Sequence, residues 1–227
     1  MYNSKIIIAL DFSSKEETLQ FLNQFGEEKL FVKIGMELFY KEGPSIVSEI
    51  KAMGHNIFLD LKLYDIPNTV AKAIHSLGSL GVDMLTVHTS GGSEMLEKAN
   101  TAAKQYDLNL LGVTVLTSQD VSELPKTDYD LKTIIDDLAT KANQAGLYGI
   151  VCSALDIPTI EVEANNLNFV TPGIRLAGDS ADDQKRIMTP DEAIENGANL
   201  LVVGRSITNS QNPHETYTQV QKLIGEK

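Results

Sequence analysis

The stretch from Asn56 to Thr89, NIFLDLKLYDIPNTVAKAIHSLGSLGVDMLTVHT, combines two short apolar runs with a helical segment between them. The runs at 56–63 and 84–89 are nearly continuous in apolar residues, which is typical of strands covered on both faces of a sheet. The segment 67–80 starts at a proline and is followed by Gly81, the usual place for a left-handed residue after a helix. The stretch therefore predicts a strand, a helix and a second strand.

The same alternation extends over the whole chain. Apolar runs that we expect to be strands occupy 5–11, 30–36, 56–63, 84–89, 109–116, 148–153, 168–174 and 199–206. Segments with helical character occupy 15–25, 41–53, 67–80, 92–105, 131–146, 154–165, 189–197 and 213–225. No linker or low-complexity tract divides them. The pattern predicts an α/β fold, a single-domain (β/α)8 TIM barrel over residues 1–227, with an open doubly wound sheet as the alternative.

Length, charge and cysteine content limit the class of protein. A chain of 227 residues suits one barrel, and its net charge of −12 argues against nucleic acid or an anionic membrane as partner. The single cysteine, Cys152, excludes an intrachain disulfide. No apolar stretch approaches the roughly 20 residues of a membrane span, and the N-terminal run is too short for a signal-peptide core. We therefore expect a cytoplasmic protein with no membrane partner.

Polar and charged residues gather at the expected ends of the strands. Active sites of barrels lie at the C-terminal ends of the strands, in the loops that follow. The residues at or just beyond those ends are Asp11, Lys33, Asp60, Lys62, Asp65, His88, Thr117, Ser118, Arg175, Gly204 and Arg205. This convergence indicates a functional site more strongly than any single motif does.

Asp60 and Lys62 are two residues apart in an apolar context, so a regular strand points both to the same side. Charged side chains are rarely buried without a partner, and a purely structural ion pair is the alternative interpretation. Asp65 follows the strand and turns either towards its own site or towards a neighbouring subunit.

The charges in this stretch favour a particular chemistry. A lysine flanked by carboxylates stays protonated, so Lys62 suits the role of cation and general acid rather than that of a Schiff-base amine. The carboxylates repel a further anion placed beside them. The set therefore suits a reaction that loses an anionic group and then needs a proton.

The segment DLKLYDIPNT at 60–69 resembles the D-x-K-x-x-D-I-x-x-T pattern of the orotidine 5′-monophosphate decarboxylase family. The resemblance covers essentially the whole chain. Its other blocks are ALDF at 9–12, VKIG at 32–35, VHTSGG at 87–92, VTVLTS at 113–118, TPGIR at 171–175 and VVGRSIT at 202–208. D-x-K-x-x-D also occurs in related phosphosugar lyases, but the combination with the last two blocks is highly specific.

The resemblance implies a homodimeric barrel that converts orotidine 5′-monophosphate to uridine 5′-monophosphate and CO₂ without a metal or an organic cofactor. This is the last step of de novo pyrimidine biosynthesis. It implies that Lys62 donates a proton to C6 of the ring and that Asp60 lies beside Lys62, near the substrate carboxylate. Asp65 would come from the partner subunit, and Lys33 would join the same charged network.

The resemblance also assigns the binding residues. Asp11 and Lys33 would bind ribose hydroxyls, and Thr69 of the partner subunit would contact the ribose or phosphate side. Thr117 or Ser118 would meet the pyrimidine edge, with the choice left open. The remaining residues would line the ring pocket or hold the phosphate: Pro172 for the ring, and Gln184, Gly204 and Arg205 for the phosphate, with Arg175 nearby. The polar segment 176–188 is either a loop that closes over the phosphate or an ordinary solvated loop.

Two other functions compete with this one. A phosphosugar lyase of the same broad group would need Mg²⁺ and an acidic ligand where this chain has Lys33. A nucleotide sensor without activity would not need anionic groups beside an anionic ligand. His55, His75 and His214 lack metal-ligand spacing, so we expect no metal site, and we interpret the lone His88 as structural.

Overall fold

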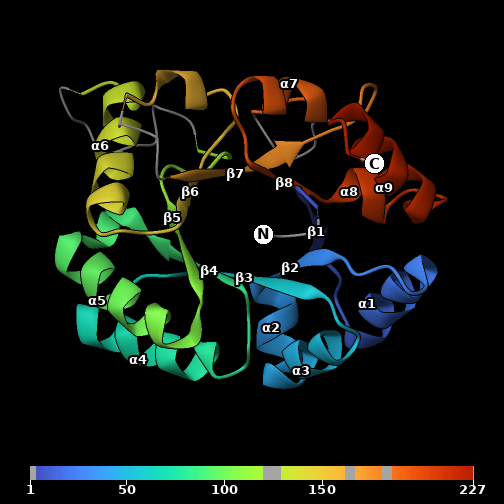
Figure 1. Ribbon diagram of the computed structural model, residues 1–227, viewed down its shortest axis with the longest axis horizontal. Coiled ribbons are helices and arrows are strands. Elements are labelled where there is room, and N and C mark those ends of the chain that lie inside the picture. The colour runs from blue at the N-terminus through green and yellow to red at the C-terminus, as the bar shows by residue number, and fades with distance from the viewer. Residues whose placement is uncertain (1–3, 120–128, 162–166, 180–185, 227) are drawn as a thin grey trace.

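The computed structural model describes residues 4–119, 129–161, 167–179 and 186–226, and its strands form a closed parallel barrel. The strands follow one another around the barrel in chain order, and β1 pairs with both β2 and β8 (Figure 1). Their bounds are β1 Ile6–Leu10, β2 Phe31–Gly35, β3 Asn56–Leu63, β4 Met84–His88, β5 Asn109–Val113, β6 Gly149–Val151, β7 Asn168–Ile174 and β8 Leu200–Val203. The predicted (β/α)8 barrel is confirmed, and the open sheet is excluded.

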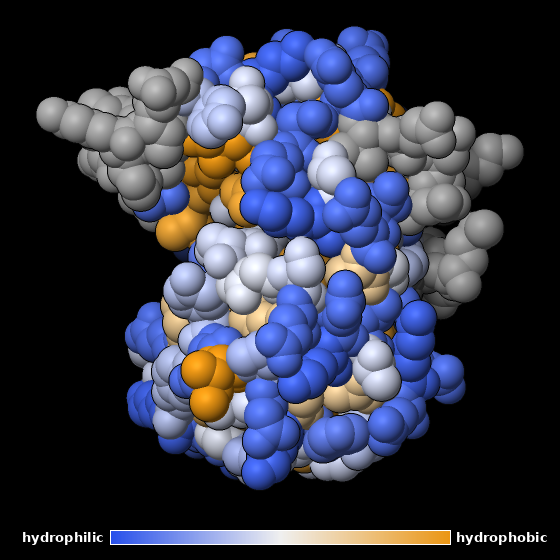
Figure 2. Space-filling view, turned by 90° about the vertical axis from the view of Figure 1, so that its left-hand side faces the viewer, coloured by the Kyte–Doolittle hydropathy of each residue, from blue (hydrophilic) through white to orange (hydrophobic). Residues whose placement is uncertain are grey.

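Helices surround the ring of strands (Figure 1). The α-helices of the described residues are α1 Lys15–Leu22, α2 Met36–Glu42, α3 Pro44–Ala52, α4 Pro67–Gly78, α5 Ser93–Ala103, α6 Leu131–Gln144, α7 Pro190–Glu195, α8 Arg205–Thr208 and α9 Pro213–Leu223. The face that carries α5 and α6 is mostly hydrophilic (Figure 2). None of the helices in these described ranges is both long and apolar enough to cross a membrane.

Alternation along the strands separates two cores. In β1, for example, Ile6 and Ile8 pack outwards against helices, whereas Ile7 and Ala9 belong to the core inside the barrel. The interior core also contains Phe31, Phe58, Met84, Leu111, Val170, Leu200 and Val202. Because Ala9, Phe58 and Val202 also line the cavity described below, this interior core forms the floor of the candidate site.

The predicted helix over 41–53 is wrong in its start and its continuity. The chain enters α2 directly after β2, at Met36, and a second helix, α3, begins at Pro44. Between them Gly43 adopts a φ of 67°, in the left-handed region that glycine accepts without a Cβ clash. This residue breaks the helical path, and the apolar periodicity of the segment gives no sign of the break.

Three further boundaries differ from the prediction. Of the helix expected over 154–165, the described part contains only a 3₁₀ turn, Ile157–Thr159, where a proline and β-branched residues disfavour an α-helix. Residues 162–166 lie outside the described residues. Strand β5 ends at Val113 rather than at 116, and β8 ends at Val203 rather than at 206. After β8 the chain turns at Gly204 into the short helix α8.

Candidate active site

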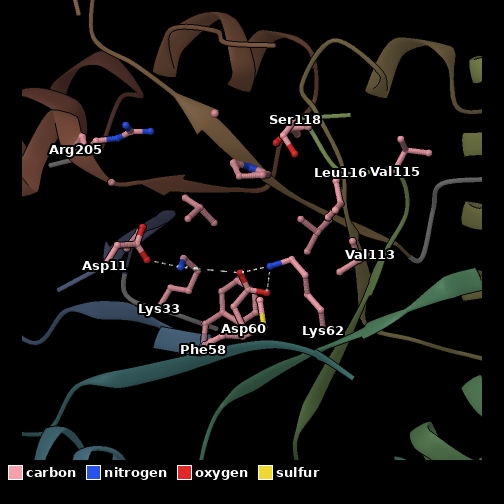
Figure 3. A pocket seen from close by; sticks show the side chains of 18 of the residues that line it. Asp11, Lys33, Phe58, Asp60, Lys62, Val113, Val115, Leu116, Ser118 and Arg205 are labelled. Atoms are coloured by element: carbon pink, nitrogen blue, oxygen red, sulfur yellow. Dashed lines mark hydrogen bonds and ion pairs between the residues drawn. The ribbon is translucent and has the colours of Figure 1, made fainter. Parts of the chain in front are cut away.

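A cavity of about 400 Å³ opens at the C-terminal ends of the barrel strands (Figure 3). It is lined by ten of the residues that the sequence predicted for the site: Asp11, Lys33, Asp60, Lys62, Thr117, Ser118, Pro172, Arg175, Gly204 and Arg205. The rest of the lining is apolar apart from Gly173 and includes Ala9, Phe58, Val113, Val115 and Val202. The cavity thus combines an apolar floor with convergent polar groups, as small-molecule sites do.

Four charged groups of alternating sign line one side of this cavity. Lys62 Nζ lies 2.9 Å from both carboxylate oxygens of Asp60. Lys33 Nζ lies 4.0 Å from Asp60 Oδ2 and 3.0 Å from Asp11 Oδ1. In Figure 3 these four side chains form a row, with Arg205 and Ser118 across the cavity from it. The predicted proximity of Asp60 and Lys62 is confirmed, and Lys33 links that pair to Asp11.

The surroundings of Asp60 keep it ionised. Burial opposes the charge of its carboxylate, whose side chain is only 15% exposed. The ammonium groups of Lys33 and Lys62, and hydrogen bonds from Lys62 and Thr86, outweigh that effect and hold the pKa of Asp60 below its ordinary value. The cavity therefore contains a fixed negative charge in direct contact with the Lys62 ammonium at neutral pH.

Strand β3 departs from regular geometry at the charged residues. Its register against β4 pairs Leu59 with Leu85 and then Leu63 with Val87, so residues 60–62 face Thr86 alone. Within this bulge Lys62 has a φ of 50°, in the left-handed region that non-glycine residues rarely adopt. We predicted that Asp60 and Lys62 point to the same side because we assumed a regular strand, but the segment 60–62 is not regular. Bulges of this kind commonly redirect side chains beside active sites.

The end of the cavity beyond β7 and β8 carries the arginines. Arg205 is the first residue of α8 and lines both this cavity and an adjoining hollow of about 360 Å³. Arg175 follows β7, is only 6% exposed, and lines both spaces as well. Gly204 lies beside Arg205 at the cavity wall. Two guanidinium groups in one place provide donors suited to a phosphate.

Two predicted residues do not line this cavity in the described part of the single chain. Asp65 and Thr69 are exposed and are absent from the lining, and Asp65 Oδ1 accepts a hydrogen bond from the backbone N–H of Ile66. Asp65 therefore does not turn back onto the cavity of its own chain. Gln184 lies outside the described residues, as does the stretch 180–185 of the segment 176–188, which we interpreted as either a loop that closes over the phosphate or an ordinary solvated loop.

His88 and Cys152 lie close to the site without lining it. The ring of His88 lies 5.7 Å from that of Tyr64, and burial together with the Lys62 charge lowers the pKa of His88 despite Asp60. Cys152 is buried, as expected for a core residue, and burial raises its pKa. Among the residues that the structure describes, no cluster of three or more His, Cys, Asp or Glu side chains has the arrangement of a metal site.

Sequence reasoning overlooked Thr86. Its hydroxyl contacts both residues of the charged pair, although it does not line the cavity. The available signal was a hydroxyl residue at an inward position of the otherwise apolar run MLTV at 84–87. The partners of that hydroxyl lie on β3, so its role can be recognised only once β3 and β4 are known to be adjacent.

Comparison with known proteins gives one consistent family. Residues 4–220 match the model of the Orotidine 5′-phosphate decarboxylase / HUMPS family. A curated orotidine 5′-phosphate decarboxylase of Ligilactobacillus salivarius is 49% identical, over 97% of this chain and 98% of its own. The enzyme of the same name from Fusobacterium nucleatum is 45% identical, over 97% and 95% of the two chains.

Solved structures agree with these sequence relatives. The crystal structure of orotidine 5′-phosphate decarboxylase from Lactobacillus acidophilus superposes with a TM-score of 0.86 at 33% identity, covering 96% of this chain and 98% of that one. An uncharacterized conserved protein from Geobacillus kaustophilus superposes with a TM-score of 0.85 at 36% identity, covering 96% and 99%. The match therefore extends over the whole barrel rather than over a shared motif.

Proposed function

The chain belongs to the orotidine 5′-phosphate decarboxylase / HUMPS family, and we propose that it decarboxylates orotidine 5′-monophosphate with Lys62 as the proton donor. The products are uridine 5′-monophosphate and CO₂, and the reaction is the last step of de novo pyrimidine biosynthesis. The observation that carries the role of Lys62 is its position, 2.9 Å from both oxygens of the ionised Asp60, in a cavity with an apolar floor.

The proposed step needs a cation that is also an acid. The bond between C6 and the carboxylate breaks, CO₂ departs, and the electron pair remains on C6 as a carbanion that the ring delocalises poorly. The Lys62 ammonium stabilises this charge as it forms and then transfers a proton to C6. A preorganised charge in a site that excludes water is commonly the largest contribution to catalysis, so we assign the larger share of the acceleration to it.

Asp60 supplies a second contribution. We propose that the carboxylate of the substrate binds near that of Asp60, and two neighbouring anions repel each other until CO₂ leaves. Binding of the distant phosphate offsets this cost. We propose that Gln184, Gly204 and Arg205 hold that phosphate, with Arg175 near Arg205 at the same end of the cavity.

The remaining lining residues orient the nucleoside. Asp11 and Lys33, joined by an ion pair of 3.0 Å, would bind the ribose hydroxyls, and Lys33 also belongs to the catalytic network. Thr117 or Ser118 would meet the pyrimidine edge above Pro172. We propose that no metal and no organic cofactor takes part.

We further propose that the active form is a homodimer in which Asp65 and Thr69 enter the site of the partner subunit. Both residues are exposed and belong to the turn and helix that follow β3. Tyr64 and Ile66, in the turn after β3, are 62% and 67% exposed, and on α2, which follows the neighbouring strand β2, Met36 is 44% and Tyr40 69% exposed. Exposed large apolar side chains are typical of a surface that another subunit covers.

A cytoplasmic location fits this assignment. The buried Cys152 is the only cysteine and forms no disulfide, which suits a reducing compartment.

The deciding experiment is an absorbance assay that follows loss of the orotate chromophore in purified protein given orotidine 5′-monophosphate. The expected result is rapid conversion that persists after dialysis against EDTA. A Mg²⁺-dependent phosphosugar lyase would lose its activity after that treatment and would leave this substrate unchanged. A protein that binds the nucleotide without converting it would show no change in absorbance.

A further inference from the structure

The hydroxyl of Thr86 connects the two charged residues at the centre of the proposed mechanism. Its Oγ1 accepts a hydrogen bond of 2.8 Å from the backbone N–H of Lys62 and donates one of 2.9 Å to Asp60 Oδ1. We propose that Thr86 is a positioning residue, which holds Lys62 and Asp60 in the geometry that the reaction needs. This inference rests on the proposed function of those two residues.

The surroundings of Thr86 make its hydroxyl unusual. The residue is 0% exposed, and on β4 its neighbours Leu85 and Val87 pack in the outer core while Met84 belongs to the core inside the barrel. A buried hydroxyl is unfavourable unless it is hydrogen-bonded, and valine has nearly the same shape without that cost. The hydroxyl at this position is therefore explained by the two bonds that it makes.

The first bond supports an unusual backbone. Residues 60–62 bulge from β3 opposite Thr86, and Lys62 has a φ of 50°. A left-handed lysine persists only where its surroundings stabilise it. The Thr86 oxygen receives the Lys62 N–H inside this bulge, where the regular pairing of β3 and β4 is interrupted. Without the hydroxyl, the Lys62 N–H would lose this acceptor.

The second bond has only one possible direction. The backbone N–H of Lys62 can only donate, so the single hydrogen of the Thr86 hydroxyl is directed to Asp60. Asp60 Oδ1 also accepts from Lys62 Nζ at 2.9 Å. These bonds form a closed ring that holds Lys62 at both its backbone nitrogen and its ammonium group. A shift of this ring of hydrogen bonds would move the Lys62 ammonium relative to C6 of the substrate. Small displacements of a reacting group lower the rate strongly.

The test compares variants that differ only in the hydroxyl. Thr86→Val should lower kcat roughly 10–100-fold while the KM for orotidine 5′-monophosphate changes less than about threefold, because the distant phosphate contacts remain. Thr86→Ser keeps the hydroxyl and should retain kcat within a few-fold of the wild type. If Thr86→Val does not fold, the pair Thr86→Ser and Thr86→Ala provides the same comparison at smaller volume.

The matched control is Thr18→Val. Thr18 is equally buried, at 0% exposure, and its hydroxyl donates only to the backbone oxygen of Ser14 beside helix α1. This variant should lose stability without losing kcat per folded molecule. A kcat of Thr86→Val equal to that of the wild type would overturn the inference.

A crystal structure of Thr86→Val tests the position directly, without reference to activity. The expected result is a changed φ at Lys62 or a lost contact between Nζ and one oxygen of Asp60. An unchanged segment 60–62 would refute the positioning role. If the wild-type protein fails to convert orotidine 5′-monophosphate, the proposed function fails, while this structural comparison still decides what Thr86 holds in place.

Discussion

Lys62 Nζ lies 2.9 Å from each carboxylate oxygen of Asp60, and one residue separates the two in the sequence. The pair is mostly buried, with side-chain exposures of 25% for Lys62 and 15% for Asp60. Folding, rather than substrate binding, therefore places the ammonium beside an anion. A charge fixed in advance need not reorganise while the reaction proceeds, which is the requirement for electrostatic catalysis.

Removal of the Lys62 amine should abolish turnover while product binding persists. Lys62→Ala deletes both the cation and the proton source, and we expect the rate of decarboxylation to fall at least about 10³-fold. Calorimetric titration with uridine 5′-monophosphate should still give a dissociation constant near that of the wild type. Lys98→Ala, which removes an exposed lysine paired with Glu94 on α5, should leave both quantities unchanged. Near-wild-type turnover of Lys62→Ala would refute the assigned role.

Mixed dimers should reveal whether Asp65 acts across the subunit interface. Lys62→Ala and Asp65→Asn should each be nearly inactive alone, but together they can form a heterodimer with one complete site. Random exchange of subunits in equal amounts gives about half heterodimers, so the mixture should recover about a quarter of the wild-type activity. If Asp65 instead serves its own chain, both sites of the heterodimer are defective, and the mixture should stay inactive.

Loss of the Arg205 guanidinium should weaken only phosphate-dependent binding. A charge-assisted contact of this kind contributes about 1.5–3 kcal/mol, so Arg205→Ala should weaken binding of uridine 5′-monophosphate roughly 10–100-fold. Binding of uridine, which lacks the phosphate, should not change. Lys222→Ala removes an exposed positive charge from α9 outside the cavity and should leave nucleotide affinity intact. Equal losses for the nucleotide and the nucleoside would show that Arg205 does not hold the phosphate.

The sequence predicted the ring of strands and the polar residues at the strand ends because both follow from local patterns. Parallel strands of a barrel end on one side, so Asp11, Lys33, Asp60 and Arg205 had to meet once the strands were recognised. The prediction of 41–53 as a single helix failed because the break depends on the backbone of a single residue, Gly43.

The bulge at Lys62 could not be predicted from the sequence of β3 alone. Its geometry depends on the hydroxyl of Thr86, which belongs to the adjacent strand and lies 24 positions further along the chain. Only the three-dimensional register of β3 against β4 brings the two together. The role of Asp65 is a similar case, because the contact that we propose for it depends on a second copy of the chain and not on the local sequence.

A buried histidine at the opposite end of β3 should make the fold sensitive to acid. His55 is 3% exposed, its Nδ1 accepts a hydrogen bond of 3.1 Å from the Leu30 N–H, and its Nε2 has no hydrogen-bond partner among the residues that the structure describes. Burial, with a smaller effect of the Lys29 charge, lowers the pKa of His55 in the folded protein. The unfolded chain therefore binds its proton first as the pH falls, and stability that is complete above about pH 6.5 is lost progressively below it.

Urea unfolding at pH 7.5, 6.5 and 5.5 should show this loss as a falling free energy of unfolding. His55→Asn can still accept the Leu30 N–H through its side-chain oxygen but does not titrate, so its stability should depend less on pH. Part of the dependence should remain, because burial and Lys62 also lower the pKa of His88. His75→Asn on α4 removes a histidine that is only partly buried and should keep the wild-type slope. If the free energy of unfolding of His55→Asn falls with pH as steeply as that of the wild type, groups other than His55 cause the acid sensitivity.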